Sequence, residues 1–246
     1  MGSELCERVA RWAETLGIES RRVTTAADLS AAFQGKPEAC RPGIDARAID
    51  AWERRHGFAL PESLRAWLRL SNGFYTENGP LIHPLSGIGP MVPFARMPEI
   101  VVQPESWFEL GNPNVETVCI DLGYHWPGPE GGPPIFTSGD DQTGSRPRVI
   151  ARSFEAWFLD VLALGGEEYW FRPGFEPLGD PWEAHRRLAP APPLPDRLRE
   201  LAPKVLSLMR PGVDDRGIAT TLGISRGDVE ALFRHLQHVP DRHLLP

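Results

Sequence analysis

The 246-residue sequence contains few of the features that mark membrane-bound or secreted proteins. No stretch reaches about 18 consecutive apolar residues, the length that a helix needs to cross a bilayer, so we expect no membrane span. The N-terminus lacks the apolar core of a secretory signal, and Cys6 stands where a myristoylation signal requires Ser or Thr. These absences predict a cytoplasmic protein without a lipid anchor.

Cysteine is also scarce. The three cysteines, Cys6, Cys40 and Cys119, are widely spaced, which favours reduced thiols in a reducing compartment over a disulfide framework. The sequence has no phosphate-binding loop, no Gly-x-Ser-x-Gly nucleophile motif and no zinc-type cysteine pair. The absence of these motifs gives no reason to expect a cofactor or a bound metal ion.

Acidic residues outnumber basic residues by 33 to 26, and the formal net charge at pH 7 is -7. The excess falls on residues 44–165, which hold fifteen acids and nine bases, whereas the flanking parts of the chain are close to neutral. An acidic surface speeds encounter with basic partners and repels nucleic acid. Solubility alone also explains such a charge, so a basic protein partner is compatible with the sequence but not required by it.

The pattern of hydrophobic residues, turns and prolines divides the chain into four parts. They are an N-terminal helical lead (1–43), a domain of helices and short strands (44–171), a proline-rich linker (172–195) and a helical module (196–246). Within the lead, periodic apolar residues predict a helix over 4–16, and the capping-box-like pair Thr25 and Asp28 predicts a second, short helix through Phe33. Dense prolines oppose both helix and central strand, so the linker is predicted to be a semi-rigid spacer, with Phe175 and Trp182 as its anchors to the core.

Two adjacent helices open the second part of the chain. The first carries Ile49 and Trp52, and the second begins near Pro61, which suits a first helical turn because proline lacks an N–H group. The second helix has an apolar stripe at i, i+3 and i+4 spacing, formed by Leu64, Trp67 and Leu68. The pair Asn72-Gly73 predicts both the end of this helix and a tight turn.

Short strands are predicted to follow the helix pair, and a last helix closes the domain. One or two strands are expected within 79–94, and alternating or β-branched runs predict three more, over 115–122, 133–137 and 148–151. Ser153 is the expected cap of a strongly apolar helix that ends at Gly165-Gly166.

The order helix, Gly-x-x-Leu-Pro, helix, Asn-Gly between Ile49 and Phe74 resembles the opening of the Smi/Knr family of the SUKH superfamily. The segment Ala151 to Phe154, ahead of the last helix, is similar to the way that family closes. The resemblance covers roughly residues 44–165. It implies an α+β fold, in which helices flank a mostly antiparallel sheet, and a protein-binding module rather than an enzyme. It also implies the role of many bacterial members, which are immunity proteins that neutralise a cognate toxin, frequently a nuclease, by binding it.

Two acidic loops are the predicted binding site for a protein partner. The loop from Gly123 to Pro134 carries aromatic side chains, which often anchor interfaces when a rigid sheet supports them. The predicted contact residues are Asp121, Tyr124, Trp126, Glu130, Asp140 and Asp141. Alternatively, Trp126 folds back as a lid on the core. Asp121 and His125 also allow a metal or acid/base site, although solvated side chains at a strand end are the more ordinary explanation.

The C-terminal module resembles the trihelical helix-turn-helix units of sigma-factor region four and LuxR-type regulators. Ala219 and Gly223 have the spacing of two helices that approach closely, and Ser225 with Asp228 predicts a capped second helix. Arg226 and Arg234 would be the nucleic-acid contacts if the module bound DNA. Residues 196–246 hold eight bases and seven acids, a balance that provides little attraction for phosphates. The alternatives are therefore a DNA-binding regulator, a scaffold, or self-association through this module.

Overall fold

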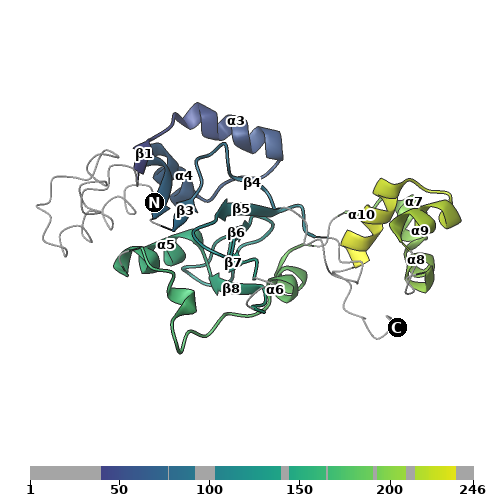
Figure 1. Cartoon of the computed structure of the whole chain (residues 1–246). Coiled ribbons are helices and arrows are strands. Elements are labelled where there is room, and N and C mark those ends of the chain that lie inside the picture. Colours follow the sequence, from purple (N-terminus) through teal and green to yellow (C-terminus); the bar gives the residue numbers. More distant parts are fainter. Residues whose placement is uncertain are drawn as a thin grey trace, which may run out of the picture. The chain divides into compact units, whose positions relative to one another are not determined.

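A computed structural model describes residues 40–76, 78–91, 103–139, 144–164, 166–190, 193–208 and 214–236 (Figure 1). The helices predicted over 4–16 and 25–33 lie outside these residues. The described residues form two compact units: a sheet unit, from residues within 40–91 and 106–185, and a C-terminal helical unit, from residues 103–105 and within 186–236. Each described helix is too short or too polar to span a lipid bilayer.

The sheet unit begins with the two predicted helices, α3 (Ala46–His56) and α4 (Glu62–Leu70). The carboxylate of Asp45 caps α3 by accepting a hydrogen bond from the Arg47 backbone N–H at 2.8 Å. Both predicted apolar stripes are buried, since Trp52 is 7% exposed and Trp67 is 0% exposed. The ring of Trp52 lies 5.2 Å from the ring of Phe108 in the sheet, which confirms that these helices pack against it.

Helix α4 ends where the sequence predicts. The prediction of a tight turn at Asn72-Gly73 is wrong, because the chain continues directly into strand β2 (Ser71–Thr76). This strand pairs with β1 (Cys40–Pro42) and β3 (Gly79–Ile82) in a three-stranded antiparallel sheet. Phe74 is buried against the rings of Trp67 and Phe158, at 5.8 and 6.2 Å. Burial of this aromatic side chain outweighs the local preference of Asn-Gly for a turn.

A second, five-stranded sheet has the order β4-β5-β6-β7-β8, and all its pairs are antiparallel. Its strands are β4 (Gly89–Pro90), β5 (Trp107–Gly111), β6 (Val118–Asp121), β7 (Ile135–Thr137) and β8 (Arg148–Ala151). The last three fall within the predicted strands, whereas β5 was not predicted. The fold is therefore α+β with antiparallel sheets, as expected. Because β6, β7 and β8 follow one another as a meander, successive connections lie at opposite ends of the sheet.

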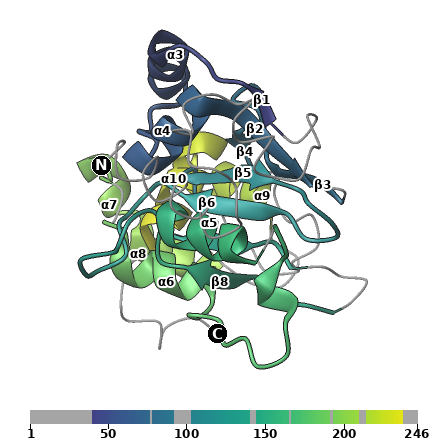
Figure 2. The ribbon, with the colours of Figure 1, turned by 90° about the vertical axis from the view of Figure 1, so that its left-hand side faces the viewer.

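Both faces of the larger sheet are covered, which explains why every residue of β6 and β7 is buried. Helices α3, α4 and α5 (Phe154–Ala163) share one core cluster with inward-facing residues of the strands, and the turned view shows α5 lying over the sheet (Figure 2). Ser153 caps α5 as predicted, because its Oγ accepts from the Ala156 N–H at 3.2 Å. The other face receives Trp182, whose ring lies 4.4 Å from that of Trp107.

Trp182 belongs to α6 (Pro181–Leu188), which lies inside the predicted linker. Before it, a 3₁₀ helix, η1 (Tyr169–Phe171), packs near Phe175, and Gly179 makes a bridge to Val149 of β8. Phe175 and Trp182 therefore anchor this segment as expected. The prediction of a spacer over 172–195 does not describe its first half, because residues up to 185 belong to the sheet unit.

The C-terminal helical unit consists of α7 (Asp196–Arg199), α8 (Ala202–Leu208), α9 (Asp215–Leu222) and α10 (Arg226–Leu236). Where the sequence predicts one first helix, the structure has α7 and α8. Pro203 explains the break, because it lacks the N–H group that would continue the helix and suits a new first turn. Gly223 adopts a left-handed conformation, φ 65°, between α9 and α10. The small core is formed by Leu198, Val205, Ile218, Val229, Leu232 and Phe233.

Candidate functional site

The most connected polar side chain of the sheet unit is Asp121, at the end of β6. It is 2% exposed. Its Oδ1 accepts hydrogen bonds from Ser106 Oγ at 2.7 Å and from the Gly123 N–H at 2.9 Å. Its Oδ2 accepts from Trp107 Nε1 at 2.8 Å and lies 2.6 Å from His185 Nδ1 on α6. Since a buried carboxylate is tolerated only with such partners, Asp121 holds α6 against the sheet.

Two predicted contact residues are thus beneath the surface. Asp121 is occupied internally, and Tyr124 is 5% exposed with its ring 5.9 Å from that of His185. His125, which the sequence pairs with Asp121, is exposed. The histidine that contacts the Asp121 carboxylate is His185, 64 residues further along the chain. Among the described residues no group of three or more His, Cys, Asp or Glu side chains could hold a metal ion. Asp121 and Tyr124 are therefore buried in the described structure, and their contact with a partner stays a prediction.

Sequence reasoning missed His185, although a signal was present. Asp180-Pro181 is a helix-start pattern, and the Asp180 carboxylate accepts a hydrogen bond from the Glu183 N–H at 3.0 Å. Trp182 and His185, three residues apart, share one buried side of the resulting helix. The prolines on both sides of this segment suggested a linker instead.

The loop that follows β6 presents Trp126 and Glu130. The Trp126 N–H donates to the Gly132 carbonyl oxygen at 2.8 Å, and the Gly131 N–H donates to that of Gly128 at 3.1 Å. A Cβ atom at Gly131 would overlap the carbonyl oxygen of Trp126, so only glycine fits this closed loop. Trp126 is half-buried and Glu130 is exposed. This half-buried position is compatible with both predicted roles of Trp126, as a lid on the core and as a surface anchor.

The two connections that carry the predicted site residues leave the larger sheet at opposite ends. Ile120 pairs with Ile135 and Val118 pairs with Thr137, so the connection after β7 leaves from the opposite end of the strands to the loop of Trp126. At about 3.3 Å per residue, the two ends of β6 are about 10 Å apart. Asp140 and Asp141, in that second connection, lie outside the described residues. The antiparallel meander thus separates loops that are neighbours in sequence.

The second end of the sheet is organised by an ion pair between Glu116 and Arg148. Arg148 Nη1 and Nη2 donate to the two carboxylate oxygens of Glu116 at 2.9 and 3.1 Å, and Ser145 Oγ donates to Glu116 at 2.6 Å. Glu116 is 0% exposed. Burial, together with the charge of Glu116, raises the pKa of the nearby Glu168 carboxyl. The geometry is a rigid, bidentate pair at the rim of the sheet.

Residues 43–160 match the SMI1 / KNR4 family (SUKH-1). This match places residues 43–160 in the SUKH superfamily. The match begins just before α3 and ends within α5, so it contains the helix pair and every strand of the larger sheet. A comparison with curated proteins finds no match to the chain. At the level of the family, membership supports a protein-binding role.

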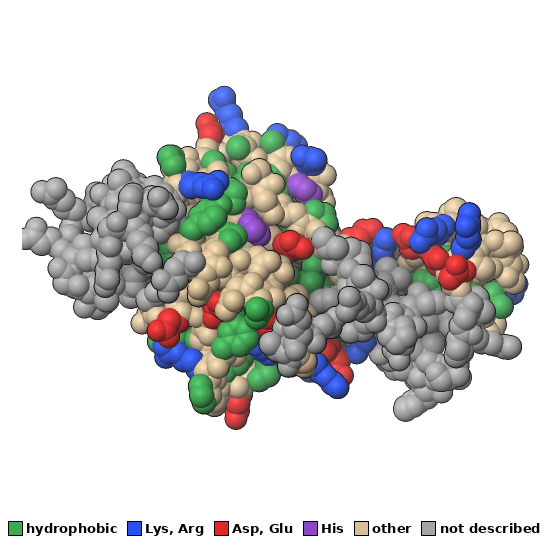
Figure 3. Space-filling model, in the orientation of Figure 1, with side chains coloured by type: hydrophobic (Ala, Val, Ile, Leu, Met, Phe, Trp, Pro, Cys, Tyr) green, Lys and Arg blue, Asp and Glu red, His purple; other side chains and the backbone are tan. Residues whose placement is uncertain are grey.

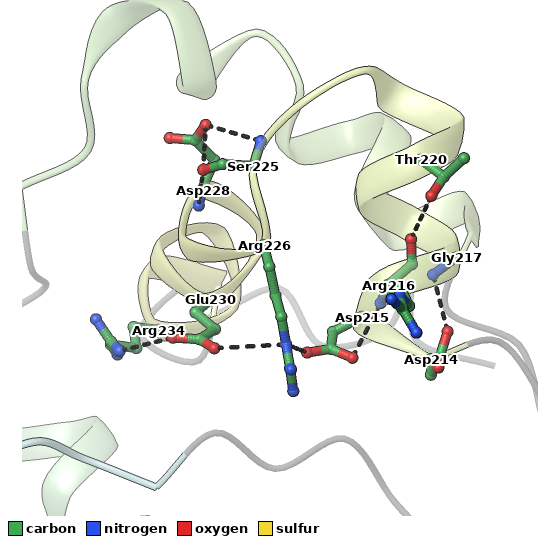
Figure 4. A network of polar contacts seen from close by, with 10 residues as sticks. All are labelled: Asp214, Asp215, Arg216, Gly217, Thr220, Ser225, Arg226, Asp228, Glu230 and Arg234. Atoms are coloured by element: carbon green, nitrogen blue, oxygen red, sulfur yellow. Dashed lines mark hydrogen bonds and ion pairs between the residues drawn. The ribbon is translucent and has the colours of Figure 1, made fainter.

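Outside the SUKH segment, the C-terminal helical unit carries the two arginines predicted to contact nucleic acid. Arg226 forms an ion pair with Asp215 and lies 3.9 Å from Glu230, and Arg234 lies 3.4 Å from the same Glu230 (Figure 4). The hydrogen bond and charge of Asp215 raise the pKa of the Arg226 guanidinium. Both arginines, which lie on α10, therefore already face carboxylates of α9 or α10.

The capping box predicted at Ser225 is present. Asp228 accepts hydrogen bonds from the Ser225 N–H at 3.2 Å and from Ser225 Oγ at 2.8 Å, while Ser225 Oγ accepts from the Asp228 N–H at 3.1 Å (Figure 4). Arg197 of α7 donates to Asp228 at 2.8 Å, and these contacts lower the pKa of the Asp228 carboxyl. Asp228 therefore stabilises the helical unit and adds negative charge where a DNA-reading helix begins.

Proposed function

We propose that this protein is a SUKH-type immunity protein, which binds a cognate toxin and neutralises it without catalysing a reaction. The observation that carries the proposal is the family match over residues 43–160. The acidic balance of residues 44–165 favours a basic partner, and a nuclease is such a partner because it must attract the phosphates of its substrate. We further infer a cytoplasmic location, with which the buried, unbridged thiol of Cys119 is compatible.

Three carboxylates of the sheet unit support binding over chemistry, because they already serve internal contacts. Glu116 holds Arg148, and Asp121 holds α6. Glu53 accepts a hydrogen bond from the Leu60 N–H at 2.8 Å and pairs with Arg65, which joins α3 to α4. Glu116, Asp121 and Glu53 thus each have a structural role.

The test is co-expression with the protein encoded by the neighbouring gene. We expect that protein to arrest growth when expressed alone, and growth to recover when both are expressed. The purified pair should form a stoichiometric complex in calorimetry. A neighbouring product that is harmless, or that fails to bind, would remove the immunity role and favour the scaffold alternative.

A further inference from the structure

Among the described residues, three large hydrophobic side chains stand out as exposed: Val115 at 53%, Phe171 at 45% and Leu178 at 37%. They come from three segments, namely the connection before β6, η1, and the stretch that leads to α6. Figure 3 shows hydrophobic side chains on the lower part of the molecule, where Figure 1 draws the chain between α5 and α6. Single exposed apolar residues are ordinary, but convergence of several is typical of an interaction site.

The three segments meet at Arg148. Its guanidinium lies 5.5 Å from the ring centroid of Phe171. The same group holds Glu116, which directly follows Val115. The Leu178 N–H donates at 2.9 Å to the carbonyl oxygen of Val149, the residue after Arg148. We call Val115, Arg148, Phe171 and Leu178 the Arg148 patch.

The Arg148 patch is held rigidly before any partner arrives. Arg148 is fixed by two hydrogen bonds to a carboxylate that is 0% exposed, and its side chain is itself only 17% exposed. Leu178 is fixed through its backbone to the edge of β8. Binding to such a surface orders few side chains, and aromatic and arginine side chains of this kind often dominate interface energetics.

The charge around the patch indicates what it would bind. Residues 166–180, which supply Phe171 and Leu178, contain four acids and one base. The base, Arg172, is already paired with Glu167, and Arg148 is paired with Glu116. Glu176 of the same segment is exposed. The surplus negative charge is therefore complementary to a cation supplied by a partner.

We propose that the Arg148 patch seats a basic protein partner, one that presents an arginine or lysine beside an apolar side chain. This inference rests on the proposed immunity function and names the surface that performs it. It places the contact at the opposite end of the larger sheet from the loop of Trp126. The two surfaces can therefore be tested separately on the full-length chain.

The experiment measures binding of the neighbouring gene's product to Phe171→Ser and Leu178→Asp variants by calorimetry. We expect each to weaken binding about 30-fold or more, as for loss of an anchoring side chain. Glu176→Lys, on the exposed acidic segment, should slow association and reduce its salt dependence. Trp126→Ala probes the loop at the other end of the sheet, and Arg55→Ala, at an exposed position of α3, is the control that should bind within about twofold of the unchanged protein. Tryptophan fluorescence during unfolding verifies that each variant folds. If Phe171→Ser does not fold, the binding of Leu178→Asp provides the test.

Three results would overturn the proposal in different ways. Loss of binding in Trp126→Ala with full binding in Leu178→Asp would move the contact to the other loop and keep the immunity function. A dimer of the unchanged protein in light scattering that Leu178→Asp converts to monomer would identify a second copy of the chain as the occupant. Absence of any binding by the neighbouring product would remove the immunity function together with the patch.

Discussion

The contact between Asp121 and His185 makes a strong prediction about stability, because it joins two buried side chains, one on β6 and one on α6. Removing one member of a buried, hydrogen-bonded pair costs about 3–5 kcal/mol, since the other is left without its partner. Asp121→Ala should fall in the upper part of this range, because it also strands Ser106 Oγ and Trp107 Nε1. His185→Ala should cost about 2–3 kcal/mol, because Asp121 keeps its other donors.

The double variant should cost less than the sum of the two single variants, with a coupling of about 1–3 kcal/mol. Urea unfolding followed by tryptophan fluorescence is the assay. All eight tryptophans lie at or before Trp182, so the signal reports on the sheet unit and not on residues 186–246. Glu183→Ala, exposed on the same helix, is the control and should stay within about 0.5 kcal/mol of the unchanged protein.

A His185→Ala variant as stable as the control would refute this reasoning. It would mean that α6 is not held on the sheet in solution, and that residues 172–195 behave as the spacer that the sequence predicts. Trp182→Ala offers an independent check, because deleting a tryptophan that is 8% exposed costs about 3–5 kcal/mol if the helix is docked.

Three other predictions follow. Glu168→Gln should stabilise the sheet unit at pH 7, and this advantage should disappear toward pH 4. The pKa of Glu168 is raised in the folded protein, so folding favours the protonated carboxyl and the stability of the unchanged protein falls as pH rises. An equal advantage in urea unfolding at both pH values would contradict this. Ser225→Ala should destabilise the C-terminal helices by about 1 kcal/mol, because the variant loses the N-cap of α10. Circular dichroism is the measurement, because that unit has no tryptophan. Thr220→Ala, on the exposed side of α9, is the control and should have a smaller effect. A random-sequence DNA duplex should show no micromolar complex with the chain at low salt, because Arg226 and Arg234 face carboxylates; a micromolar complex that weakens steeply with salt would instead support a DNA-binding regulator.

Local signals in the sequence located most helices and several strands. Periodic apolar residues predicted α3 and α4, because a helix that buries one side must repeat it every three to four residues. Ser153 predicted the start of α5, and Ser225 that of α10, because a capping side chain acts on N–H groups only a few residues away. These features depend on neighbours in the chain, so a single sequence contains them.

The sequence did not predict strand β5, and it predicted a turn where β2 continues as a strand, for a different reason. The residues of β5 are nearly all buried, with Trp107 and Phe108 on opposite faces, so the strand lacks the alternation of a half-exposed one. In β2, the Asn-Gly pair signals a turn, and only the burial of Phe74 between helices explains why the chain continues as a strand. In both cases the deciding neighbours lie far away in sequence.

By itself, the sequence determined the α+β class, the helix pair and the resemblance to the SUKH superfamily, because these follow from periodicity and from motifs within short windows. Only the tertiary structure decided the arrangement of the candidate site. The antiparallel meander places the loop of Trp126 and the start of the connection after β7 at opposite ends of the sheet. Docking of α6 buries Asp121 against His185, and three distant segments converge on Arg148. Strand order and packing bring these residues together, and no local pattern along the chain encodes which of them meet.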